Sequence, residues 1–154
     1  MASTLDAGLA RLNRKLTRTI PQKAKAAAVA AVIQGAHEVA ELQYALAPVD
    51  DGDLRNSIEV TPPGSTTPPY SQPGGSQVAR EGQALITAGN TKVRHAHLVE
   101  YGTAPHVNAG QFPGTQHPGT AAEPFFFPAW RALRSRVRAR ITRSINKAIK
   151  DGAR

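Results

Sequence analysis

The sequence predicts an α+β domain, with helices at both ends of the chain and a small antiparallel sheet between them. Apolar residues recur at helical spacing near both termini, two short apolar runs occupy the middle, and spans rich in proline and glycine separate those runs. The length of 154 residues fits a single domain. We therefore expect N-terminal helices, a small sheet with long hairpin loops, and a long basic C-terminal helix packed on the sheet.

The first 46 residues predict helices. Four leucines at helical spacing indicate an amphipathic helix over residues 4–19: Leu5, Leu9, Leu12 and Leu16. Pro21 either breaks this helix or begins the next one, which is rich in alanine and covers residues 22–46. Because each alanine buries little area, this second helix needs a sheet or a neighbouring subunit to pack against.

The middle of the chain predicts a hairpin. A turn at residues 50–53 follows the second helix, and strands are expected near residues 56–61 and at residues 83–89. Between the strands, residues 61–75 are rich in proline, glycine, serine and threonine, which predicts a long exposed loop. We expect residues 61–80 to become ordered only on assembly.

Residues 93–101 fit helical spacing and strand alternation about equally well. We favour a short helix that lays Leu98 and Tyr101 on the sheet. Gly102 after this segment suits a chain terminus that needs a positive φ. The span 104–120 is irregular, holds a short two-stranded ribbon, and is expected to order on assembly like the first loop.

A second long helix is predicted over residues 128–150, with Pro128 in its first turn. Its apolar stripe consists of Trp130, Leu133, Val137, Ile141, Ile145 and Ala148. Three consecutive phenylalanines, Phe125–Phe127, precede it between Pro124 and Pro128. Three successive side chains cannot all face one side, so we expect this aromatic segment to supply both core packing and at least one subunit contact.

Charge is unevenly distributed along the chain, whose net charge is +8. Residues 1–25 carry six lysines and arginines against one aspartate, and residues 129–154 carry nine against one. Residues 26–128 carry four against nine acidic residues. The alternatives are solvated helix faces, proximity to DNA, or head-to-tail contact between oppositely charged surfaces of neighbouring subunits.

The sequence offers little for catalysis or metal binding. There is no cysteine, no nucleophile motif and no phosphate-binding loop. His95, His97, His106 and His117 form the one cluster of possible zinc ligands, but on a helix the first two would point to different faces. No apolar run is long enough to cross a membrane, and no signal peptide is expected. We therefore expect that the protein is not an enzyme and binds neither a metal nor a cofactor.

Three blocks carry a resemblance to a known family: A-P-V-D-D-G-D-L-R-N-S-I at residues 47–58, V-E-Y-G-T at 99–103 and P-F-F-F-P-A-W at 124–130. In this order and spacing they resemble the tail-completion, or head–tail joining, family of long-tailed double-stranded DNA phages. Asp51 stands where that family usually has threonine, and aspartate can cap the turn in the same way. The Pro-rich spans look like insertions particular to this chain.

The resemblance implies a structural virion protein, assembled in the host cytoplasm, that forms a sixfold ring at the phage neck. The ring would complete the tail, join it to the head and pass DNA non-specifically through its channel, in contact with neck and tail-tube proteins and no membrane. Candidate interface residues are Glu100, Tyr101, Phe125, Phe126, Phe127, Asp50, Asp51 and Asp53. Candidate residues for DNA contact or electrostatic assembly are Arg134, Arg138, Arg143 and Lys147. The alternative is a non-specific DNA-binding protein that uses its basic terminal helices.

Overall fold

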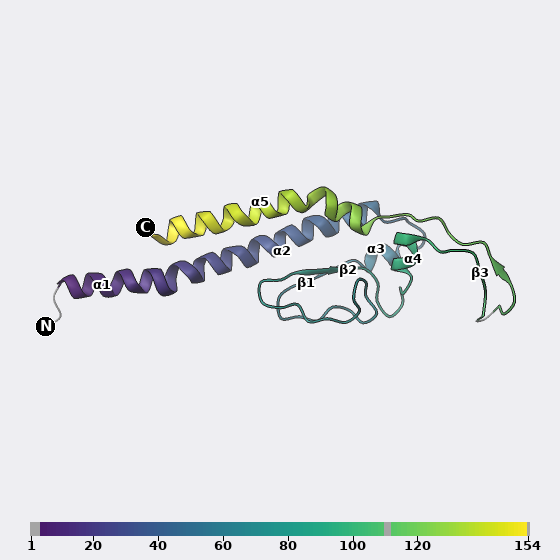
Figure 1. The fold of residues 1–154 in the computed structure, drawn as a ribbon, viewed down its shortest axis with the longest axis horizontal. Coiled ribbons are helices and arrows are strands. Elements are labelled where there is room, and N and C mark those ends of the chain that lie inside the picture. Colours follow the sequence, from purple (N-terminus) through teal and green to yellow (C-terminus); the bar gives the residue numbers. More distant parts are fainter. Residues whose placement is uncertain (1–3, 110–111, 154) are drawn as a thin grey trace.

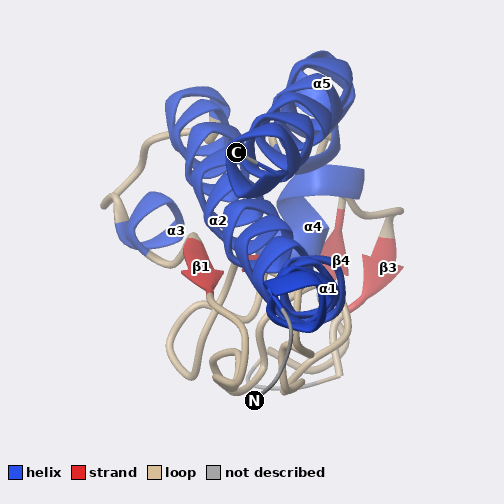
Figure 2. Cartoon of the chain, turned by 90° about the vertical axis from the view of Figure 1, so that its left-hand side faces the viewer, coloured by secondary structure: helices blue, strands red, loops and turns tan. Residues whose placement is uncertain are grey.

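The computed structural model describes residues 4–109 and 112–153. Two long antiparallel helices form an elongated body, and loops with two small sheets lie along one half of it (Figures 1 and 2). Both termini lie at the opposite end, away from the sheets (Figure 1). The predicted class of mixed helix and sheet is confirmed. No helix in the part of the chain that the structure describes is both long and apolar enough to span a membrane.

The N-terminal helices join end to end. Helix α1 (Thr4–Arg14) passes through a π-helical turn (Lys15–Thr19) into α2 (Ile20–Leu46), as Figure 1 shows. Pro21 lies in the first turn of α2 and does not interrupt the helix. A proline at this position removes one N–H group and crowds the carbonyl four residues earlier. The π turn relieves that conflict, because the N–H of Ile20 bonds to the Lys15 carbonyl, five residues back.

The C-terminal helix α5 (Phe126–Ala153) begins two residues before the predicted start and ends three after the predicted end. It packs along α2, and the expectation that it packs on the sheet is wrong. The helices approach closely because Gly35 faces Val137: a Cβ on Gly35 would lie 2.6 Å from Val137 Cγ1. Gly152 is likewise buried against Ile20. Glycines on both helices thus allow α2 and α5 to pack closely against each other.

The predicted hairpin is present with shorter strands. After the short helix α3 (Asp53–Asn56), β1 (Glu59–Thr61) pairs antiparallel with β2 (Leu85–Thr87), with Val60 opposite Ile86. The predicted ribbon is also confirmed, as β3 (His106–Val107) pairs with β4 (Gln116–His117). The ribbon extends away from the body at the end opposite the termini (Figure 1).

The loop between β1 and β2 folds on itself. The Gly64 N–H donates to the Ala79 carbonyl over 2.8 Å, and the Thr67 N–H donates to the Gln77 carbonyl over 2.8 Å. Thr67, Ser71 and Ala79 are buried. Although its composition predicted a long exposed loop, this segment forms backbone hydrogen bonds across itself and buries three of its residues.

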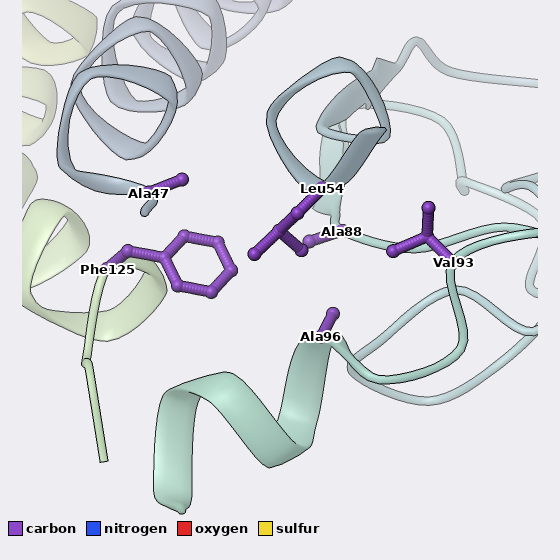
Figure 3. Close-up of a cluster of buried hydrophobic side chains, with 6 residues drawn as sticks. All are labelled: Ala47, Leu54, Ala88, Val93, Ala96 and Phe125. Atoms are coloured by element: carbon purple, nitrogen blue, oxygen red, sulfur yellow. The ribbon is translucent and has the colours of Figure 1, made fainter. Parts of the chain in front are cut away.

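The main hydrophobic cluster lies where α2 ends and α5 begins. It contains Ala47, Leu54, Ala88, Val93, Ala96 and Phe125 (Figure 3). The short helix α4 (Ala96–Tyr101) confirms the favoured assignment for that segment, but it buries Ala96 and Glu100. Leu98 and Tyr101 are 40% and 67% exposed, so the expectation that they pack on the sheet is wrong.

Trp130 is also placed differently from expectation. It is 38% exposed, whereas Ala129 beside it is fully buried and Val137 is nearly so. The buried face of α5 therefore passes through Ala129, because that is the side on which α2 approaches. The predicted burial of Trp130 is wrong, and the nucleus of the aromatic segment is Phe125.

Candidate functional site

Glu100 caps the N-terminus of α5. Its Oε2 accepts hydrogen bonds from the N–H groups of Phe125 and Phe126, both at 2.8 Å, and its Oε1 accepts one from Phe127 at 3.1 Å. The next residue is Pro128, which has no N–H group. One buried carboxylate thus satisfies every free donor at the start of a 28-residue helix. A negative charge at this end of a helix also interacts favourably with the helix dipole.

The turn after α4 places Glu100 under α5. Gly102 has a φ of 71°, and a Cβ there would lie 2.6 Å from the Thr120 carbonyl oxygen, so glycine is required on both counts. The expectation for this glycine is confirmed. The returning chain is held by a hydrogen bond from the Glu123 N–H to the Val99 carbonyl over 2.8 Å. The V-E-Y-G-T block therefore positions both the carboxylate and the irregular segment that leads to α5.

The three phenylalanines divide between core and surface. Phe125 is buried, whereas Phe126 and Phe127 are half-buried. The Phe127 ring lies 6.3 Å from the exposed ring of Tyr101, and both rings line a small apolar pocket of about 50 Å³ next to Ala96. The structure thus brings five predicted interface residues together at one junction, Glu100 inside it and Tyr101 at its surface.

The three aspartates lie elsewhere, on the exposed turn between α2 and α3. Asp51 Oδ1 accepts a hydrogen bond from the Asp53 N–H over 2.9 Å, so aspartate caps this turn as expected. Asp50, Asp51 and Asp53 are all exposed. They present a local negative surface separate from the aromatic junction.

The four basic candidates on α5 are exposed but do not share one face. Arg134 and Arg138 are one turn apart, and so are Arg143 and Lys147. The two pairs are separated by nine residues, which places them about 180° apart around the helix. Lys147 borders α2 in a shallow hollow beside Ala30 and Ala31. The four basic residues predicted as one group therefore form two separate rows on the helix.

One arginine of α5 is partly covered and paired with α2. Arg140 Nη1 lies 2.5 Å from Glu38 Oε1, and Arg136 Nε lies 3.9 Å from the other carboxylate oxygen. Hydrogen bonding to Arg140 holds the pKa of Glu38 below its ordinary value, against the smaller opposing effect of burial. This pairing links the two long helices. No ion pair within residues 4–109 and 112–153 involves Arg134 or Arg138.

Three of the four candidate histidines lie close together, and the fourth lies apart from them. His106 and His117 stack across the β3–β4 ribbon with their ring centroids 4.9 Å apart, and His95 lines the same hollow of about 460 Å³. His97 lies instead beside the aromatic junction. Among the described residues, no group of three or more histidine, aspartate or glutamate side chains is placed to hold a metal ion.

Sequence reasoning missed two features. It named Glu100 without its capping role, although one signal was available: no serine, threonine, aspartate or asparagine immediately precedes α5, so its donors need a distant acceptor. It also predicted the leucine stripe of α1 without predicting its exposure. Leu5, Leu9, Leu12 and Leu16 are 52–73% exposed.

Comparison with known proteins gives one match. A family model described as "Bacteriophage HK97-gp10, putative tail-component" matches residues 10–102, which is more than half of the chain and runs from α1 to the glycine after α4. A search of curated proteins and a search of solved structures each found no match. The block at residues 47–58 and all but the last residue of the block at 99–103 lie within the matched range, and the chain belongs to the HK97 gp10-like family of phage tail components.

Proposed function

We propose that this tail component is a structural subunit of a ring at the phage neck, where it completes the tail and joins it to the DNA-filled head. The observation that carries the proposal is a separation of charged surfaces, with basic helices at one end of the subunit and an exposed acidic turn toward the other. The helices at the end with the termini are strongly basic, and the acidic turn and strand lie toward the other end. Subunits with unlike ends can associate head to tail, and such contacts close into a ring when the rotation between neighbours divides a full turn.

The two rows on α5 suit two different tasks in such a ring. Arg136 and Arg140 lie on the same side of α5 as Arg143 and Lys147 and are engaged with Glu38 of α2. The Arg134–Arg138 row has no ion-pair partner in the described segments. We assign the Arg134–Arg138 row to the channel, where it meets DNA phosphates. Few arginines per subunit keep that contact weak, and DNA can then slide through the channel.

The elongated body supports a structural role. The conserved chemistry of an active site is not needed for assembly, and the buried acid at the aromatic junction is used to cap a helix. In this proposal the protein acts without cofactor or metal, in the virion, next to neck and tail-tube proteins. Its aromatic junction and its acidic turn are the interface candidates.

The first test is imaging of the purified protein by negative-stain electron microscopy, with sedimentation velocity as a second measure. Rings of uniform size are expected. Monomers at all concentrations, combined with tight binding to duplex DNA, would contradict the proposal and favour a free DNA-binding protein. Binding to one defined DNA sequence would contradict it as well.

The second test compares the two rows. Arg134→Glu/Arg138→Glu should leave rings intact but impair DNA retention in assembled particles. Arg143→Glu/Lys147→Glu is the matched variant, with the same charge change on the opposite face, and it should not affect DNA retention. If both pairs weaken duplex binding equally and each lowers the salt dependence by about one unit of slope per lost phosphate contact, the channel assignment is wrong.

A further inference from the structure

Helix α1 presents an apolar face that nothing in the described chain covers. Leu5, Leu9 and Leu12 of α1 and Leu16 of the π-helical turn fall on one side of the continuous helix and are 52–73% exposed. In Figure 1 the helix extends past the C-terminal end of α5, and the last contact with α5 is made by Lys15, whose Nζ donates to the Ala153 carbonyl over 3.3 Å. The opposite face of the helix is basic, with Arg11, Arg14 and Arg18 exposed.

A groove with complementary properties lies between α2 and β1. It has a volume of about 480 Å³, and its apolar lining comes from Ala40, Tyr44, Ile58 and Val60. Two exposed acids, Glu41 and Glu59, also line it. One cation lies nearby, but the Arg55 guanidinium is engaged 5.6 Å above the Tyr44 ring, and its Nε donates to the Ala47 carbonyl over 2.8 Å.

The chain cannot fill this groove with its own α1. Leu9 and Ala40 belong to the same continuous helix, which holds them about 46 Å apart at 1.5 Å per residue. The occupant must therefore come from another molecule. A leucine face with a basic outer side matches an apolar groove with acidic walls, in the manner of an amphipathic helix bound in a groove.

We propose that α1 of one subunit docks, leucines inward, in the groove between α2 and β1 of the next copy of this chain. The contact joins unlike surfaces, so each subunit offers one α1 and one groove, and the chain of contacts closes into a ring where the rotation between subunits divides a full turn. This inference rests on the proposed ring and names the contact that builds it. The positive charges on the outer side of the docked helix then lie over a groove whose walls carry Glu41 and Glu59, and the charges attract each other across the contact.

Charge reversal gives a sharp test. Variant A carries Arg11→Glu, Arg14→Glu and Arg18→Glu, and variant B carries Glu41→Lys and Glu59→Lys. Each alone places like charges in the contact, so each should weaken assembly tenfold or more in sedimentation velocity. An equimolar mixture should assemble again, because both the A–B and the B–A contacts are then complementary. If B alone assembles like the wild type, or if the mixture stays dissociated, the proposal is wrong.

Disulfide trapping identifies the occupant directly, because the chain has no cysteine of its own. A mixture of the single variants Leu9→Cys and Ala40→Cys should form a cross-linked dimer under mild oxidation, and neither variant alone should do so. A dimer from Leu9→Cys alone would show instead that two α1 helices pair with each other. That result would overturn the proposal.

A third measurement separates this inference from the proposed ring. Leu9→Lys/Leu12→Lys should abolish rings of the purified protein, and far-ultraviolet circular dichroism should show that the subunit is still helical. If these rings persist, the ring stands but α1 does not build it. If the wild-type protein forms no ring at all, the proposed function itself fails. Normal rings combined with loss of infectivity would place α1 against a different phage protein and overturn the inference.

Discussion

The continuous N-terminal helix has two halves, α1 and α2, and they differ in how far their apolar side chains are buried. In α1 the leucines at positions 5, 9, 12 and 16 are the largest apolar residues of the segment, yet they remain exposed. In α2 the buried residues are smaller or polar: Ala31, Gly35, Ala36, Val39 and Gln43. The halves are continuous, so local helix propensity does not separate them. Burial follows the presence of α5, which covers α2 and ends before α1 (Figure 1).

The comparison shows that a more hydrophobic helix is not the better buried one. Small residues let two backbones approach, and the close contact between Gly35 and Val137 depends on the missing Cβ. The leucines of the N-terminal segment leave most of their apolar area exposed in the single subunit. Each half can therefore be altered to test whether it depends on α5.

The largest change in stability is expected from removing the cap of α5, the helix that packs against α2. Glu100→Ala leaves one buried and two half-buried N–H donors at the start of α5 without their acceptor, and the subunit should lose about 3 kcal/mol of unfolding free energy, since an unsatisfied buried donor costs about 1–3 kcal/mol and a half-buried one less. Urea denaturation followed by circular dichroism measures this loss. Glu123→Ala is the control, since that exposed side chain makes no cap, and it should change stability by less than about 0.5 kcal/mol. Equal losses in the two variants would contradict the capping role.

Glycine-to-alanine changes should have opposite signs in the two halves. Gly35→Ala forces a Cβ against Val137 and should cost about 1–3 kcal/mol. Gly8→Ala meets no atom within 4 Å and should stabilise α1 by about 0.5–1 kcal/mol, because alanine favours the helix. Thermal unfolding of the two variants measures both stability changes and shows whether their signs differ. A stabilised Gly35→Ala would mean that α2 and α5 are not closely packed.

Truncation should distinguish the halves in the dissociated subunit. Val39→Ala removes two buried methyl groups and should cost about 1–2 kcal/mol. Leu9→Ala removes a larger but exposed side chain and should change stability by less than about 0.5 kcal/mol. Both are measured at a concentration below that of assembly. A large loss for Leu9→Ala under those conditions would show that α1 is packed within the monomer.

The smallest expected effect is on the pH dependence of stability, and it arises from Glu38 of α2. Because the pKa of Glu38 is lowered in the folded subunit by Arg140, the pair stabilises the α2–α5 contact above the ordinary glutamate pKa. That contribution is lost as the pH falls from the ordinary value through the lowered one. Glu38→Gln should therefore flatten the fall of stability in acid. Glu41→Gln, one turn away and exposed, should leave the acid profile as in the wild type.

Much of the fold was predictable because it depends on local signals. The leucine spacing of α1, the turn at Asp51, the strand partners around Val60 and the glycine at position 102 each depend on a few neighbouring residues. These features are confirmed by the structure.

The remainder depends on which segments meet in space. The sequence does not show that α2 takes α5 as its partner, and that choice turns Trp130 toward the surface and Ala129 inward. Glu100 lies 25 residues before the donors it caps, beyond the reach of a capping motif. The division of the basic residues of α5 into two rows follows from helix geometry, but their separate roles require the position of α2.

The π turn at Lys15–Thr19 has a consequence for the direction of α1. Its hydrogen bonds span five residues, so the turn holds one residue more than an α-helical turn and changes the phase of the helix by about 100°. Five residues therefore set the azimuth of the leucine face relative to α5. A one-residue deletion in this turn would turn that face by roughly a quarter of a revolution and leave the composition of the leucine face intact. In the proposed assembly, where α1 joins successive subunits, the angle between them would follow from the winding of this single turn.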